Sequence, residues 1–178
     1  MKKILLSIAL LGLNLNAINI DKSVTISGDN GGYVKNGSAW NFADNKNKVR
    51  ILMYVDPDEQ SKGKAFMPTT FDLEKKYGQK DFVIQVILNL DATWIPNIVI
   101  NKKLEAKQVK IPNREFIVDK EGVLVKKWGL IDDEYNVLAF DSNNNLIFNK
   151  VGAMSKKDIS ELSNKLDKAI KVKTKGNN

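Results

Sequence analysis

The pattern of apolar and polar positions predicts alternating strands and helices over most of the chain. Two nearly continuous apolar runs, 49–55 and 82–90, are typical of strands that are covered on both faces of a sheet. Three shorter strands are predicted at 116–118, 137–140 and 146–150. The polar turn 141–145 joins the last two strands and predicts a hairpin.

The first helix has a distinct start signal directly after the strand 49–55. Asp56 is a favourable N-cap, Pro57 suits the first helical position, and Glu59 stands where a capping box places an acid. Pro68 lies inside the segment and predicts a kink or break there. Gly78 predicts its end.

Three further helices complete the pattern. The segment 97–108 is helical in character, Asp119 is expected to cap a short helix that ends at Trp128, and Ser155 with Asp158 forms a capping box for the last helix. The order is strand–helix three times, then strand–strand–helix. It predicts a three-layer α/β/α sandwich with a mixed sheet.

The segment before this core is expected to add an N-terminal β-hairpin and a loop. The short runs 23–27 and 33–35 flank a glycine-rich stretch that contains Asn-Gly, a common hairpin turn. The polar loop 36–47 follows, with Trp40 and Phe42 as expected anchors onto the core.

Residues 1–17 have the pattern of a secretory signal peptide. Lys2 and Lys3 precede the apolar run 4–13, and Ala17 is a small residue where cleavage is expected. The run is shorter than the roughly 20 apolar residues of a membrane span. An uncleaved anchor or a buried helix is the alternative. Export with cleavage predicts a mature protein that is free in the periplasm, and no cysteine follows the apolar run to carry a lipid.

The mature segment 18–178 is expected to form one domain. It comprises the hairpin and loop 18–47, a core 48–171 and a basic, disordered tail 172–178. The net charge of +7 is dispersed except for the lysine-rich stretch 165–175. Because the chain is expected to be exported, nucleic acid is not an expected partner.

The composition excludes several kinds of chemistry at once. The 178 residues include neither cysteine nor histidine. Thiol–disulfide exchange, triads built on histidine and the common zinc sites are therefore ruled out.

The order and residues of the predicted elements resemble those of periplasmic thioredoxins. The segments that carry the resemblance are 49–55, Met67-Pro68, 116–122, 128–130 and 138–155. The pattern is most similar to the YtfJ family, which shares Phe-Ile-Val-Asp-x-x-Gly, an acidic stretch at 132–134 and the lead 151–155 into the last helix. The resemblance implies a thioredoxin-like fold and a periplasmic location, and it implies no activity.

On this resemblance, both parts of the thioredoxin redox site are replaced. The two cysteine positions fall near Gln60-Ser61 and Gly63-Lys64. The cis-proline position falls at Glu134 or Tyr135.

The loops at this end of the sheet hold the candidate binding residues. Asp56, Asp58 and Glu59 are expected near Asp91 and the acidic stretch 132–134, although helix capping also accounts for the first three. The expected partner groove comprises Asp56, Asp58, Glu59, Trp94, Glu134 and Tyr135. No catalytic residue, cofactor or metal ligand is assigned. The sequence favours a non-catalytic module that binds a periplasmic protein or peptide. The alternative is an enzyme that uses these carboxylates, alone or with a divalent metal ion.

Overall fold

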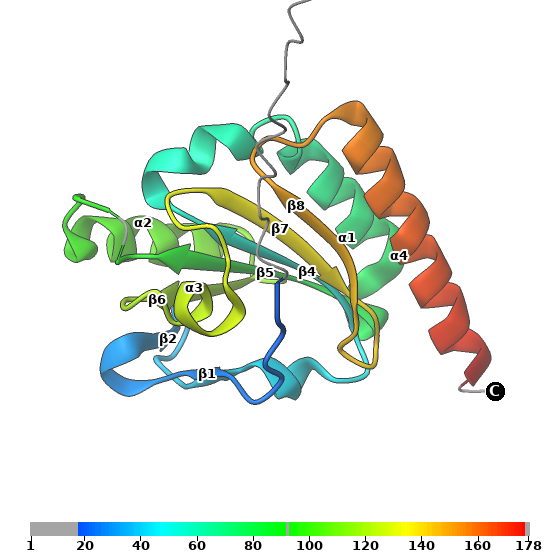
Figure 1. Ribbon diagram of the computed structural model, residues 1–178, viewed down its shortest axis with the longest axis horizontal. Coiled ribbons are helices and arrows are strands. Elements are labelled where there is room, and N and C mark those ends of the chain that lie inside the picture. Colours follow the sequence, from blue (N-terminus) through cyan, green and yellow to red (C-terminus); the bar gives the residue numbers. More distant parts are fainter. Residues whose placement is uncertain (1–17, 92, 177–178) are drawn as a thin grey trace, which may run out of the picture.

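A six-stranded mixed sheet runs through the computed structural model, which describes residues 18–91 and 93–176 (Figure 1). The strand order is β2-β6-β5-β4-β7-β8. The strands are β2 (Gly31–Tyr33), β4 (Val49–Val55), β5 (Phe82–Asn89), β6 (Glu115–Asp119), β7 (Tyr135–Phe140) and β8 (Leu146–Val151). Strands β4, β5 and β6 are parallel, and β7 lies antiparallel to β4. Every residue of β4 is buried, as its apolar run predicts.

Helices cover both faces of the sheet. They are α1 (Met67–Asp81), α2 (Asn97–Lys110), α3 (Val123–Trp128) and α4 (Lys156–Gly176). Helices α1, α2 and α4 pack on one face, and α3 packs on the other with the segment before β4. Trp40 and Phe42 are fully buried against Trp128, which confirms their predicted role as anchors. No helix in the described ranges is both long enough and apolar enough to cross a membrane.

The predicted N-terminal hairpin is wrong. The short strand β1 (Thr25–Ile26) pairs with β3 (Trp40–Asn41), whereas β2 pairs with β6. Gly31 explains the difference, because a Cβ atom there would lie 2.1 Å from the carbonyl oxygen of Val118. Gly31 therefore permits close approach to β6 rather than a tight turn between β1 and β2.

The predicted first helix is two separate helices. A 3₁₀ helix, η3 (Pro57–Gly63), precedes α1, and the Asp56 carboxylate accepts a 2.7 Å hydrogen bond from the Asp58 backbone N–H, which confirms the N-cap. Glu59 forms no capping box and pairs instead with Lys62 at 2.8 Å. Pro68 lies in the first turn of α1, where a missing N–H costs nothing, so the predicted kink or break is a break directly before α1.

The last helix has the predicted start and a different end. Ser155 and Asp158 each accept a hydrogen bond from the other's backbone N–H, at 3.2 and 2.9 Å, which confirms the capping box. Residues 172–176 continue α4, so the prediction of a disordered tail is wrong for them. Lys173 forms an ion pair with Asp81, which ties this part of the helix to the end of α1. Residues 177–178 and the predicted signal peptide 1–17 lie outside the described part of the chain.

Candidate functional site

The acidic loops meet at one edge of the sheet, as predicted. Strands β4 and β5 are parallel and end at this edge, and the antiparallel β7 begins there. Asp56 follows β4, Asp91 follows β5, and residues 132–134 precede β7. The Asp56 backbone N–H donates to the carbonyl oxygen of Glu134 at 3.1 Å, which joins two of these loops.

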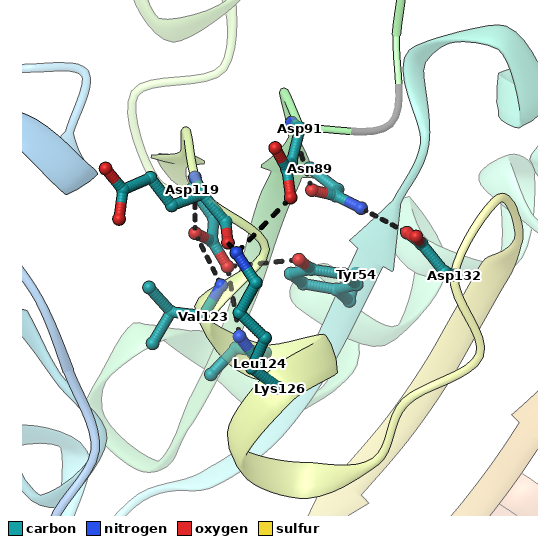
Figure 2. A network of polar contacts seen from close by, with 9 residues as sticks. Tyr54, Asn89, Asp91, Asp119, Val123, Leu124, Lys126 and Asp132 are labelled. Atoms are coloured by element: carbon teal, nitrogen blue, oxygen red, sulfur yellow. Dashed lines mark hydrogen bonds and ion pairs between the residues drawn. The ribbon is translucent and has the colours of Figure 1, made fainter.

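A buried carboxylate fixes the short helix α3 beside this edge (Figure 2). Asp119 is fully buried and accepts hydrogen bonds from the backbone N–H groups of Val123 and Leu124, at 2.9 and 3.1 Å. It also accepts from the Tyr54 hydroxyl at 3.0 Å. Burial, followed by the charge of Asp119, raises the pKa of Tyr54. The predicted capping role of Asp119 is confirmed, and it is a structural one.

Asn89 ties the end of β5 to the loop before β7 (Figure 2). Its buried amide donates to Asp132 at 2.8 Å, and its carbonyl oxygen accepts from the Asp91 backbone N–H at 3.2 Å. Lys126 forms an ion pair with Asp91 at 3.4 Å. Sequence reasoning did not single out Asn89. The sequence feature that could have indicated it is a polar residue near the end of the apolar run 82–90.

Asp56 is the buried acid of the site. Only 1% of its surface is exposed, and its second carboxylate oxygen, Oδ2, has no hydrogen-bond partner among the described residues. Burial raises its pKa from 3.8 to about 6, opposed by the Asp58 N–H and assisted by the nearby charges of Asp133, Asp58 and Asp132. Asp56 therefore caps η3, and ionisation of its carboxyl group costs free energy because the group is buried.

Lys62 neutralises two of the predicted groove acids. Its ammonium lies 2.8 Å from Glu59 and 2.7 Å from Glu134. The hydrogen bond from Lys62 lowers the pKa of Glu134, and the same contact raises the pKa of Lys62. Lys62 thus links these two carboxylates across the edge, and neither is left unpaired to bind a partner.

The two predicted groove aromatics have different surroundings. Tyr135 is only 3% exposed, so it packs inside the protein and is not an exposed residue of the acidic loops. Its ring fills the space above Gly63, where an added Cβ would lie 2.7 Å from the ring, and its hydroxyl contacts the Met53 sulfur at 3.0 Å. Burial raises the pKa of Tyr135 to about 12. Trp94 is 85% exposed, and the neighbouring Thr93 donates to Asp58 at 3.2 Å.

The carboxylates do not gather into a metal site within residues 18–91 and 93–176. No three acidic side chains there have a geometry that would hold a metal ion. Apart from Asp119, the edge therefore has one buried acid, two acids paired through Lys62, and exposed acids on the three loops.

A family model described as bacterial protein of unknown function (YtfJ_HI0045) matches residues 12–169. The chain belongs to the YtfJ family. It is 25% identical over 134 residues to the uncharacterized protein YtfJ of Escherichia coli, a match that covers 74% of this chain and 72% of that protein. The resemblance expected from the sequence is confirmed.

Solved structures similar to this YtfJ family member are thioredoxin-like. One is an exposed lipoprotein thioredoxin of Streptococcus pneumoniae, with a TM-score of 0.58 and 18% identity over 78% of this chain and 98% of that one. Another is a secreted disulfide oxidoreductase of Mycobacterium tuberculosis, with a TM-score of 0.54 and 14% identity over 82% and 95% of the two chains. The predicted thioredoxin-like α/β fold is confirmed.

In this YtfJ family member, the two segments expected at the positions of the thioredoxin redox site do face each other. Gly63 lies against Tyr135, but the chain has no cysteine, and no peptide bond in the described ranges is cis. Thiol chemistry at this contact is excluded, and an aromatic ring fills it.

Proposed function

We propose that this YtfJ family member is a non-catalytic periplasmic module that binds a segment of a protein or peptide at the acidic edge. The acidic edge is the set of exposed residues Asp58, Asp91, Trp94, Ile131, Asp132 and Asp133. The observation that carries the proposal is the 85% exposure of Trp94, whose neighbour Thr93 bonds Asp58 of this edge. An exposed indole leaves a large apolar surface in contact with water, which a partner could cover. Tryptophan is enriched at the centres of protein interfaces.

The charge of the edge indicates the chemistry of the partner. Asp58, Asp132 and Asp133 form no ion pair within the described part of the chain, although the whole chain carries a net charge of +7. Their shared negative field would attract lysine or arginine side chains and repel acidic segments. The segment that fits is therefore basic, with at least one apolar side chain to cover Trp94 and the 43% exposed Ile131.

Site-specific photocrosslinking in intact cells tests the proposal. A photoreactive amino acid replaces Trp94 in one protein and Val172, which is 71% exposed near the end of α4, in the control. We expect discrete crosslinked partners from position 94 that are missing from position 172. Identical patterns from both positions, or none from position 94, would contradict binding at the acidic edge.

The periplasmic location is part of the proposal and has its own test. It is supported by the signal-like residues 1–17 and by the similarity to an exposed and to a secreted thioredoxin-like protein. A fusion of residues 1–17 to an enzyme that is active only after export should give activity. Replacing Lys2 and Lys3 by glutamate should reduce it, and an inactive unmodified fusion would exclude export by this segment.

A carboxylate-dependent enzyme is the second candidate, because the pKa of Asp56 is raised to about 6 by burial. A divalent ion bound there would stabilise the folded protein by about 2.7 kcal/mol at 100 times its Kd. Thermal unfolding with Mg²⁺, Ca²⁺ and Mn²⁺ measures this effect. The metal-dependent form of this candidate fails if none of the three ions raises the unfolding temperature, or if Asp56→Asn leaves the increase unchanged.

A further inference from the structure

An apolar pocket lies between α1 and α2, on the sheet face away from α3. Its volume is about 290 Å³. The sheet forms its floor, and Val86 is the one residue of β5 that is not fully buried. On α1, Met67 is 37% exposed and Phe71 is 45% exposed where they line the pocket. The two helices therefore leave part of the sheet uncovered between them.

The interior of the pocket is apolar and its polar groups are already paired. Met53 and Tyr135 line one wall and contact each other through the tyrosine hydroxyl. Arg114 lines another wall, but its guanidinium bonds the Glu74 carboxylate at 2.7 and 3.0 Å and the Thr70 hydroxyl at 3.0 Å. A ligand inside would therefore meet methyl groups, thioethers and aromatic rings rather than free charge.

The mouth of the pocket carries a cation without an acidic partner. Lys107 lines the pocket from α2, and the only hydrogen bond of its ammonium group within the described ranges is a 3.4 Å contact to the Gln60 side chain. Burial, followed by the charge of Lys103, lowers the pKa of Lys107. An anion bound at this position would stabilise the charged form of Lys107 and so offset the effects of burial and of Lys103.

We propose that this pocket binds a small amphipathic carboxylate, with its hydrocarbon chain in the pocket and its carboxylate at Lys107. A volume of about 290 Å³ holds about ten non-hydrogen atoms at the roughly 30 Å³ that one water occupies in the liquid. A linear carboxylate of about eight carbons has this size. The inference is independent of the proposed function, because the acidic edge attracts cations whereas the mouth of this pocket attracts an anion.

Calorimetric titration of the full mature chain tests the proposal. The probes are sodium octanoate, 1-octanol and octylammonium chloride, which share a chain and differ in the charge of the head group. We expect saturable octanoate binding with a Kd below about 1 mM, about tenfold weaker octanol binding, and no saturation with octylammonium. Equal affinities for the three probes, or no saturation with octanoate, would overturn the proposal.

Two lysine variants and the methionine methyl groups locate the binding. Lys107→Gln should weaken octanoate binding by about tenfold, the effect of one charge-assisted hydrogen bond, and leave octanol binding unchanged. Lys110→Gln, on the same helix but outside the pocket lining, is the matched control and should change neither. In NMR spectra, octanoate should shift the methyl signals of Met53 and Met67 but not that of Met154, which lies outside the lining. An unchanged octanoate affinity in Lys107→Gln, or shifts at Met154 alone, would place the carboxylate elsewhere and overturn the assignment.

Discussion

Replacing Asp56 by asparagine should change how the stability of the protein depends on pH. The substitution keeps the shape of the side chain and the oxygen that accepts from the Asp58 N–H at 2.7 Å. It removes the only group that can be charged at this 1% exposed position. The new amide nitrogen stands where Oδ2 has no described partner, which costs about 1–2 kcal/mol at every pH.

The magnitude follows from the difference in pKa between the folded and unfolded states. Burial raises the pKa of Asp56 from 3.8 to about 6, a shift of about two units that corresponds to about 3 kcal/mol. Between these values the folded protein binds a proton that the unfolded chain has released. The contribution of Asp56 to the free energy of unfolding is therefore greatest below pH 3.8, falls as the pH rises to 6, and stays low above that.

The Asp56→Asn variant should consequently be less stable than the natural sequence at pH 3.5 and more stable by about 1–2 kcal/mol at pH 7.5. Urea unfolding of both proteins at several pH values measures the difference, in which the other carboxylates cancel. Asp72→Asn, an exposed charge on α1, controls for the general loss of one acid. A difference between Asp56→Asn and the natural sequence that stays constant from pH 3.5 to 7.5 would refute the assignment of a raised pKa to Asp56.

Three stability predictions follow from other contacts, each measurable by urea unfolding. Gly63→Ala should cost about 1–3 kcal/mol, because the added Cβ would lie 2.7 Å from the Tyr135 ring, and an unchanged midpoint would show that the ring moves away freely. Ser155→Ala should cost about 1 kcal/mol through loss of the cap to Asp158, and no loss would mean that the α4 start is held by packing alone. Arg50→Ala should cost about 3 kcal/mol or more, because the fully buried guanidinium donates to two acceptors and lies 3.9 Å from an aromatic ring centre; a cost below 1 kcal/mol would contradict its structural role.

The parts of the fold that the sequence predicted are those encoded by local patterns. The continuous apolar run 49–55 can be satisfied only where both faces are covered, and it forms the fully buried strand β4. The spacing of Ser155 and Asp158 lets each side chain reach the other's backbone within one helical turn. The predicted start of α4 is therefore confirmed. The order of the core elements follows from such signals read in succession.

The predictions that were wrong depend on contacts between distant residues. Gly31 and its neighbours look like a turn because glycine permits turns, yet the deciding contact is the backbone of Val118 on another strand. Tyr135 precedes the predicted strand 137–140 and begins β7, and its burial depends on Gly63, which leaves room for the ring. The pocket beside Phe71 depends on the spacing of two helices, and no single segment of the sequence encodes that spacing.

The short helix η3 lies between the two proposed binding surfaces, which differ in charge. Asp58 on η3 belongs to the acidic edge, and Gln60 two residues later contacts Lys107 at the mouth of the pocket. Between them and the sheet, Tyr135 packs on Gly63 and fills the place where thioredoxin chemistry would require a thiol. The Tyr135 ring therefore fills the space between the acidic edge and the pocket. Because one ligand cannot satisfy both an anionic and a cationic surface with the same group, the two proposed surfaces would take different ligands.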